Sequence, residues 1–232
     1  MKNYSFKKAV ILLTILTVPG ILYYLLQEKG KNRYKPLGIF GGKIVAPTFH
    51  TKRGVKIPDT LYHKVRDFKL INQDNQPVSF PSDSSKISVV SFFYTRCAIG
   101  CSDMNKELFR VVKAYEKNKL LRFLSITVDP DFDTVKELKK KSNQYVIKPN
   151  KWDFLTGSET AIYELAKEDF FVDVLRDTTQ KNNIIHPTTF ILLDTEKRIR
   201  GYYNSLDKEQ VDRLIDEIKV LIAEELRNVR DR

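Results

Sequence analysis

The chain contains only two cysteines, Cys97 and Cys101, and their position constrains the fold more than any other feature. They follow an apolar run over residues 87–95 and precede a segment whose apolar residues recur at helical spacing. A strand that delivers two thiols to the start of a helix indicates a site rather than ordinary packing. Residues four apart lie on one face of a helical turn, so we expect both sulfurs to point at one atom. Because a helix amino terminus also favours thiolate, the pair predicts a soft-metal site or a redox disulfide.

The remaining pattern predicts an α/β fold. Apolar or alternating runs predict strands over residues 67–71, 77–80, 87–94, 121–128, 154–156, 189–193 and 198–203. Helical spacing of apolar residues predicts helices over residues 104–115, 135–138, 158–166 and 211–226. The order of hairpin, βαβ unit, helix, hairpin and helix predicts a central sheet flanked by helices. Two thiols at a strand-to-helix junction in this order describe a thioredoxin-like fold.

The amino-terminal segment predicts a membrane anchor. Residues 9–26 carry no charge and follow three lysines within residues 1–8. Roughly 20 apolar residues span a bilayer core, so we expect a transmembrane helix over 9–26. Basic residues flank both ends of this segment, so the positive-inside rule does not decide its orientation. A cleaved signal peptide is the alternative, but no small-residue cleavage site follows. Residues 27–58, rich in Gly, Lys and Pro, predict a linker, and residues 59–232 the thioredoxin-like domain.

A third metal ligand is predicted at His186. It precedes Pro187 at the entrance of the strand expected over 189–193. In a thioredoxin-like fold a proline at that entrance faces the thiols, so we expect the imidazole beside Cys97 and Cys101. Two thiolates and one imidazole suit Cu(I), and with an added ligand they can hold Cu(II).

Other assignments of these residues stay open. His186 can be a surface imidazole, and the cysteines can be a plain redox pair or a structural disulfide. Zinc would need a fourth ligand, for which Asp177 and His63 remain candidates. His50 and His63 otherwise read as ordinary surface residues.

Three motifs resemble the Sco/SenC family of membrane-anchored copper chaperones of cytochrome c oxidase assembly. The residues concerned are Ser91-Phe92-Phe93-Tyr94-Thr95-Arg96-Cys97-Ala98-Ile99-Gly100-Cys101-Ser102-Asp103-Met104, Leu124–Thr134 and Trp152–Gly157. His186 follows the second cysteine at about the family's distance, and the resemblance covers roughly residues 60–225. The chain departs from the family where Ala98 and Ser102 replace prolines and where Ile185 replaces an aspartate that often precedes the histidine.

The resemblance implies a function and a location. Cys97, Cys101 and His186 would be the copper ligands, and the protein would be a copper chaperone rather than an enzyme. It would deliver copper to the binuclear centre of cytochrome c oxidase subunit II, or keep the thiols of that centre reduced. Other copper chaperones, thiol reductants and the lipid bilayer would be further partners. The domain would face the periplasm from a single-pass anchor in a bacterial inner membrane, which would leave residues 1–8 in the cytoplasm.

Two alternatives keep the cysteines and change the chemistry. In a membrane-anchored thiol-disulfide oxidoreductase, Cys97 attacks a target disulfide, Cys101 resolves the mixed disulfide, and Arg96 stabilises the Cys97 thiolate. In a peroxidase, peroxide would oxidise Cys97 to a sulfenic acid.

The charge of the chain excludes one class of partner. The formal net charge of +11 indicates a solvated basic surface, or attraction to anionic lipid or an acidic protein. The positive charge is scattered and does not interleave with aromatic residues, so we expect no nucleic-acid binding.

Asp129, Asp131 and Asp133 suggest a second metal site, but we expect them to shape a turn, with Asp133 capping the following helix.

Overall fold

The computed structural model describes residues 3–29, 36–52, 54–81, 86–97, 100–176 and 184–230. The chain divides into two compact units, Met1–Pro36 and Leu37–Arg232. The first unit contains helix α1, Asn3–Lys29, which includes Pro19 and exposes apolar side chains between Val10 and Leu25. Within the part of the chain that is described, no helix combines the length and the hydropathy that a bilayer crossing requires. The membrane span over 9–26 therefore stays a prediction.

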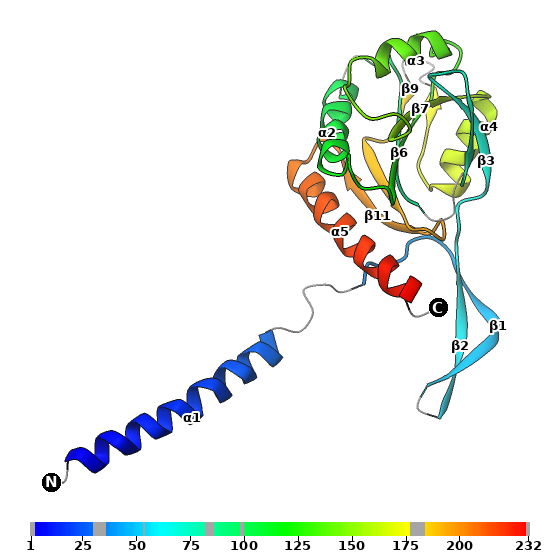
Figure 1. Ribbon diagram of the computed structural model, residues 1–232. Helices are drawn as coiled ribbons and strands as arrows, with labels where there is room; N and C mark the ends of the chain where they lie inside the picture. The colour runs from blue at the N-terminus through cyan, green and yellow to red at the C-terminus, as the bar shows by residue number, and fades with distance from the viewer. Residues whose placement is uncertain are drawn as a thin grey trace. The chain divides into compact units, whose positions relative to one another are not determined.

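The second unit is built on a mixed sheet of seven strands. Figure 1 shows this sheet at the centre of the domain. In spatial order the strands are β11 (Ile199–Asn204), β10 (Thr189–Leu193), β5 (Ile87–Phe93), β6 (Leu121–Thr127), β7 (Trp152–Thr156), β3 (Phe68–Asn72) and β4 (Pro77–Phe80). The three central strands β5, β6 and β7 are parallel, and the other neighbouring strands are antiparallel. The predicted strands are confirmed within about two residues at each end.

Helices cover both faces of this sheet. They are α2 (Cys101–Ala114), α3 (Val135–Ser142), α4 (Glu159–Glu164) with a π-helical turn over Leu165–Asp169, and α5 (Lys208–Arg230). Helices α2 and α5 contact each other on one face, while α4 lies on the other (Figure 1). The predicted α/β architecture of a central sheet flanked by helices is confirmed.

Burial explains why the central strands were predictable. Every residue of β5, β6 and β7 is buried, as expected for strands that are covered on both faces. Strand β10 pairs with β5 in the antiparallel sense, with Phe190 opposite Ser91. The carboxyl end of β5 therefore lies beside the amino end of β10, and this register brings together residues that are far apart in the sequence.

The interval predicted as a linker contains a hairpin. Strands β1 (Lys43–Lys52) and β2 (Val55–Tyr62) pair in the antiparallel sense around a turn that includes Gly54, whose φ is 80°. The compact unit begins at Leu37, so the boundary expected at residue 59 falls inside β2. The prediction missed these strands because the interval is rich in glycine, lysine and proline, a composition that is typical of linkers. A second short hairpin, β8 (Leu175–Arg176) with β9 (Ile184–Ile185), was also not predicted.

Candidate metal centre

Three side chains from distant parts of the chain converge at one end of the sheet. The Nε2 atom of His186 lies 3.1 Å from the Sγ atom of Cys101 and 3.8 Å from the Sγ atom of Cys97. One donor atom from each of the three residues lies within 4.8 Å of the others. Among the described residues, no other group of three or more Cys, His, Asp or Glu side chains brings its donor atoms this close together. Both cysteines are free thiols; Cys101 is buried and Cys97 is half-buried. Cys101 therefore lies on the buried side of the group, and Cys97 lies on the side nearer to solvent.

The two sulfurs meet by a different route from the one expected. Helix α2 begins only at Cys101, so Cys97 lies in the preceding loop and not one turn earlier on the same helix. Gly100 separates them with a φ of 88°, a conformation that favours glycine and that ends the loop. The expectation of two thiols on one helical face is therefore wrong, although the sulfurs do converge.

The imidazole of His186 is held by the backbone. Its Nδ1 atom lies 3.1 Å from the carbonyl oxygen of Phe92 and 3.2 Å from that of Pro187. Carbonyl oxygens only accept hydrogen bonds, so Nδ1 carries the proton and the lone pair of Nε2 faces the sulfurs. The ring of Tyr94 packs edge-on against the imidazole, with centroids 5.4 Å apart. A backbone carbonyl thus orients the imidazole, a role that metal sites often give to a carboxylate.

The surroundings of Cys101 favour its protonated form. A hydrogen bond with Cys97 and burial both raise the pKa of the Cys101 thiol. Cys101 can therefore donate its proton to the sulfur of Cys97. The sulfur of Cys97 is the more exposed of the two and is thus the more accessible to an incoming disulfide.

Asp133 secures the segment that leads to Cys97. Its carboxylate accepts hydrogen bonds from the amide of Thr95 at 3.0 Å and from the hydroxyl groups of Thr95 and Thr127. Burial raises the pKa of Asp133, and these hydrogen bonds partly offset that effect. The predicted capping role is wrong: Thr134 occupies the N-cap position of α3, and no side chain caps that helix.

We predict that Asp133→Asn lowers the free energy of unfolding. A hydrogen bond to a charged group contributes about 1.5–3 kcal/mol, so we expect a loss of roughly 2 kcal/mol in a denaturant titration. Asp131→Asn is the matched control, since Asp131 is 80 % exposed and a surface substitution usually changes stability by less than about 0.5 kcal/mol. Equal losses in the two variants would mean that Asp133 does not secure the loop.

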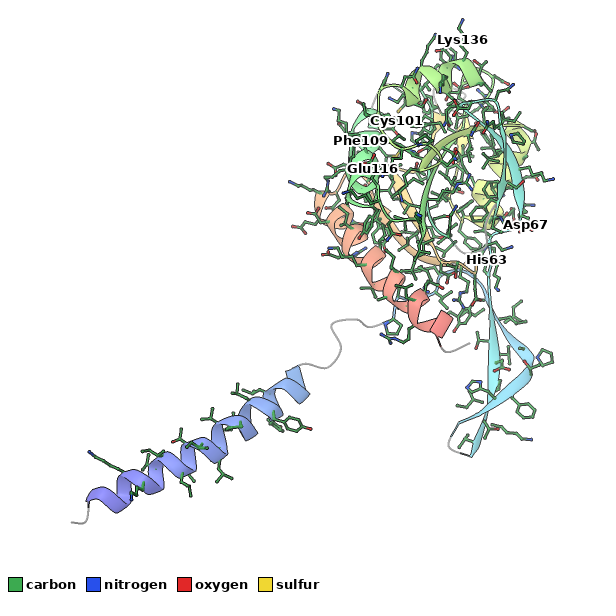
Figure 2. All side chains as sticks on the ribbon, viewed as in Figure 1. His63, Asp67, Cys101, Phe109, Glu116 and Lys136 are labelled. Atoms are coloured by element: carbon green, nitrogen blue, oxygen red, sulfur yellow. The ribbon has the colours of Figure 1, made fainter. Side chains whose placement is uncertain are left out.

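The other acidic residues and histidines serve elsewhere. Asp129 is fully buried and accepts a hydrogen bond from Nε of Arg96 at 2.6 Å, so the charge of Arg96 is engaged there rather than directed only at Cys97. His63 bonds to the backbone carbonyl of Asp169 (2.9 Å) and lies at the opposite end of the domain from Cys101 (Figure 2). His50 pairs with Asp59 on the hairpin. The predicted candidate Asp177 lies outside the described residues.

This arrangement has definite chemical capacities. Two sulfurs and one nitrogen form a soft donor set that can hold a metal ion and leaves at least one coordination position for an incoming ligand. The same sulfurs are close enough to exchange with a disulfide. Sequence reasoning missed the Phe92 carbonyl and the hydrogen bonds of Asp133, because neither a backbone acceptor nor a distant threonine leaves a local pattern.

The fold and the group define a thioredoxin-like protein with Cys, Cys and His side chains at one end of its sheet. A family model described as SCO1/SenC matches residues 58–223. The chain belongs to the SCO1/SenC family.

Relatives and solved structures agree with this assignment. The chain is 29% identical over 168 residues to the SCO1 protein homolog of Bacillus subtilis, covering 72% of this chain and 86% of that protein. The crystal structure of a SCO1/SenC family lipoprotein from Bacillus anthracis has a TM-score of 0.63 at 26% identity, over 69% of this chain and 95% of that one.

Two further structures are similar over comparable lengths. BsSco, a member of the Sco family of cytochrome c oxidase assembly proteins in which a disulfide switch was identified, has a TM-score of 0.59 at 29% identity, over 68% of this chain and 92% of that one. Arabidopsis thaliana ScoI with copper bound has a TM-score of 0.56 over 66% of this chain and 97% of that one, and its 22% identity shows the shared fold alone.

Proposed function

We propose that this protein is a copper metallochaperone. It would bind one copper ion through Cys97, Cys101 and His186 and deliver that ion to the binuclear copper centre of cytochrome c oxidase subunit II. The observation that carries this proposal is the convergence of the two sulfurs and the Nε2 atom within 4.8 Å. Thiolate sulfur selects Cu(I) over harder ions, and the imidazole adds a donor that both copper oxidation states accept.

The differing exposure of the ligands supports transfer rather than permanent storage. Cys101 is buried and His186 is held by the Phe92 carbonyl, so both keep their positions when copper leaves. Cys97 is half-buried and lies in a loop. An acceptor thiol can therefore approach from the side of Cys97, enter the open coordination position and displace one ligand at a time.

A thiol-disulfide oxidoreductase is the second candidate, and the unequal thiols favour it. The Cys97 thiolate would attack a disulfide in the target, which forms a mixed disulfide and releases one target thiolate. Cys101 would then attack the sulfur of Cys97, releasing the second target thiolate and leaving a Cys97–Cys101 disulfide. A disulfide in oxidised subunit II is a suitable target, so reduction and copper delivery can serve the same centre.

Membrane attachment through residues 9–26, with the globular domain in the periplasm, completes the proposal. The uncharged sequence of this segment is its support. A tether holds donor and acceptor near one surface and raises their effective concentration.

A transfer assay tests the proposal. Cu(I)-loaded protein is mixed with the copper-free, reduced soluble domain of subunit II, and copper on each protein is measured after separation. We expect each donor to lose its one copper ion and, at donor excess, two copper ions to be recovered on each acceptor. Retention of copper by the donor at every acceptor excess refutes delivery. Reduction of an oxidised acceptor by the copper-free protein, without copper transfer in the first assay, favours the oxidoreductase instead.

A further inference from the structure

The β1–β2 hairpin exposes apolar side chains that no described part of the domain covers. Figure 1 shows the hairpin projecting away from the sheet. Its exposed apolar residues are Ile44, Val45, Phe49, Val55, Ile57 and Leu61. The exposed fraction reaches 69% at Ile44 and 72% at Val45. Charged side chains are commonly this exposed, whereas isoleucine and valine are usually buried.

The apolar side chains occupy both faces of the ribbon. Ile44 pairs with Leu61 and Phe49 pairs with Pro58, and these two pairs lie on opposite faces because side chains alternate along a strand. An isolated two-stranded hairpin is marginally stable in water, so an apolar environment around this one would stabilise it. The ammonium of Lys56 lies 4.5 Å from the centre of the Phe49 ring, which places a cation next to an exposed apolar group.

A cationic cleft opens at the end of the sheet from which the hairpin projects. The cleft has a volume of about 550 Å³. Its charged lining consists of Lys86, Lys117, Lys119, Lys148, Lys151 and one acidic residue, Glu116. Glu116 already pairs with Lys113, and burial together with the ammonium groups of Lys86 and Lys148 lowers the pKa of Lys151 to about 8. The cleft therefore brings five lysines together with a single acidic residue.

Topology places the cleft and the base of the hairpin at the same end. The cleft residues directly precede β5, β6 and β7, so they lie at the amino ends of the parallel strands. The amide of Val65, just after the hairpin, donates to the carbonyl oxygen of Lys197 in the turn after β10. Because Leu193 pairs with Ser88, that turn also lies at the amino end of β5. The thiols follow the carboxyl end of β5 and thus lie at the opposite end of the sheet.

We propose that the β1–β2 hairpin and the lysines of the adjacent cleft dock on an anionic lipid surface. Exposed apolar groups beside cations match the boundary between acyl chains and anionic headgroups. A second copy of this chain is a poorer occupant, because two basic surfaces repel each other. The docked domain would hold its thiol end away from the lipid. The inference rests on the proposed membrane attachment, since the hairpin lies in the segment that follows the predicted anchor in the sequence.

Fluorescence quenching in vesicles tests the hairpin directly. The chain has one tryptophan, Trp152, which is 1% exposed and gives a constant background. We introduce an indole into the full chain by Phe49→Trp and, as a matched control, by Leu206→Trp, at a site that is 52% exposed beside Gly100 at the thiol end of the sheet. In vesicles of phosphatidylglycerol with brominated acyl chains, we expect strong quenching of the indole at position 49 and none at position 206.

Charge removal tests the cleft in the same assay. Each lysine near an anionic surface contributes about 1 kcal/mol, so Lys117→Gln with Lys148→Gln should lower the ratio of docked to undocked hairpin by at least about tenfold. Lys136→Gln with Lys140→Gln removes the same charge from α3, which follows the carboxyl end of β6, and should leave quenching unchanged.

Each outcome decides between the two proposals. Stable association of the chain with vesicles, without quenching at position 49, overturns the docking and leaves the attachment intact. Quenching at low salt, with association lost at high salt, supports the docking and refutes the membrane span. No association with anionic vesicles overturns both. Quenching that follows protein concentration rather than lipid charge points to contact between copies and overturns the lipid surface.

Discussion

His186→Ala should lower the Cu(I) affinity of the protein by about 100-fold. Structural metal sites with four protein ligands bind with roughly 10–16 kcal/mol, so one ligand accounts for ~3 kcal/mol, which corresponds to about two orders of magnitude in Kd. The measurement is a competition titration against a Cu(I) chelator of known affinity. We expect the variant to fold normally, because His186 is half-buried and, within the described part of the chain, its side chain forms hydrogen bonds with backbone carbonyls and thiols only.

The matched control is His50→Ala, which removes an imidazole from the hairpin, where it pairs with Asp59. This variant should bind copper as the wild type does. If both variants bind with wild-type affinity, His186 is not a ligand, and the thiols alone hold the metal.

Replacing either cysteine by serine should have a larger effect on copper and unequal effects on thiol chemistry. A hydroxyl is a hard, neutral ligand at neutral pH, so both variants lose a thiolate and should bind Cu(I) at least as weakly as His186→Ala. The variants should differ toward a disulfide target. Cys101→Ser retains the exposed thiol and should accumulate a mixed disulfide, whereas Cys97→Ser retains only the buried thiol and should react slowly.

Mass spectrometry of each variant after incubation with a disulfide peptide measures this difference. The stable adduct is expected on Cys101→Ser. An adduct that forms faster on Cys97→Ser would mean that Cys101 is the nucleophilic thiol, contrary to the acidity inferred from the hydrogen bond between the sulfurs.

The fold and the proximity of Cys97, Cys101 and His186 could be predicted from the sequence for physical reasons. Strands β5, β6 and β7 are buried on both faces, so they appear as continuous apolar runs. Pro187 marks the entrance of β10, and pairing of β10 with β5 then places His186 beside the thiols. The prediction that His186 lies beside the thiols therefore depended on Pro187 and on the expected order of the strands.

Other features left no readable pattern. Gly100 ends the loop between the cysteines, so their spacing of four did not reflect a helical face. Asp133 resembles a helix cap in sequence, but its partners Thr95 and Thr127 come from the ends of two strands. The β1–β2 hairpin lies where the sequence predicts a linker. Most side chains of β2 are exposed, so this strand has no buried face for a sequence pattern to reveal.

The central claim is that one ion is shared by the two sulfurs and the imidazole. X-ray absorption spectroscopy of the protein loaded with one equivalent of Cu(I) tests it most directly. The account predicts two sulfur scatterers and one imidazole nitrogen around each copper, with the nitrogen lost in His186→Ala. A spectrum with sulfur ligands only, unchanged in that variant, contradicts it.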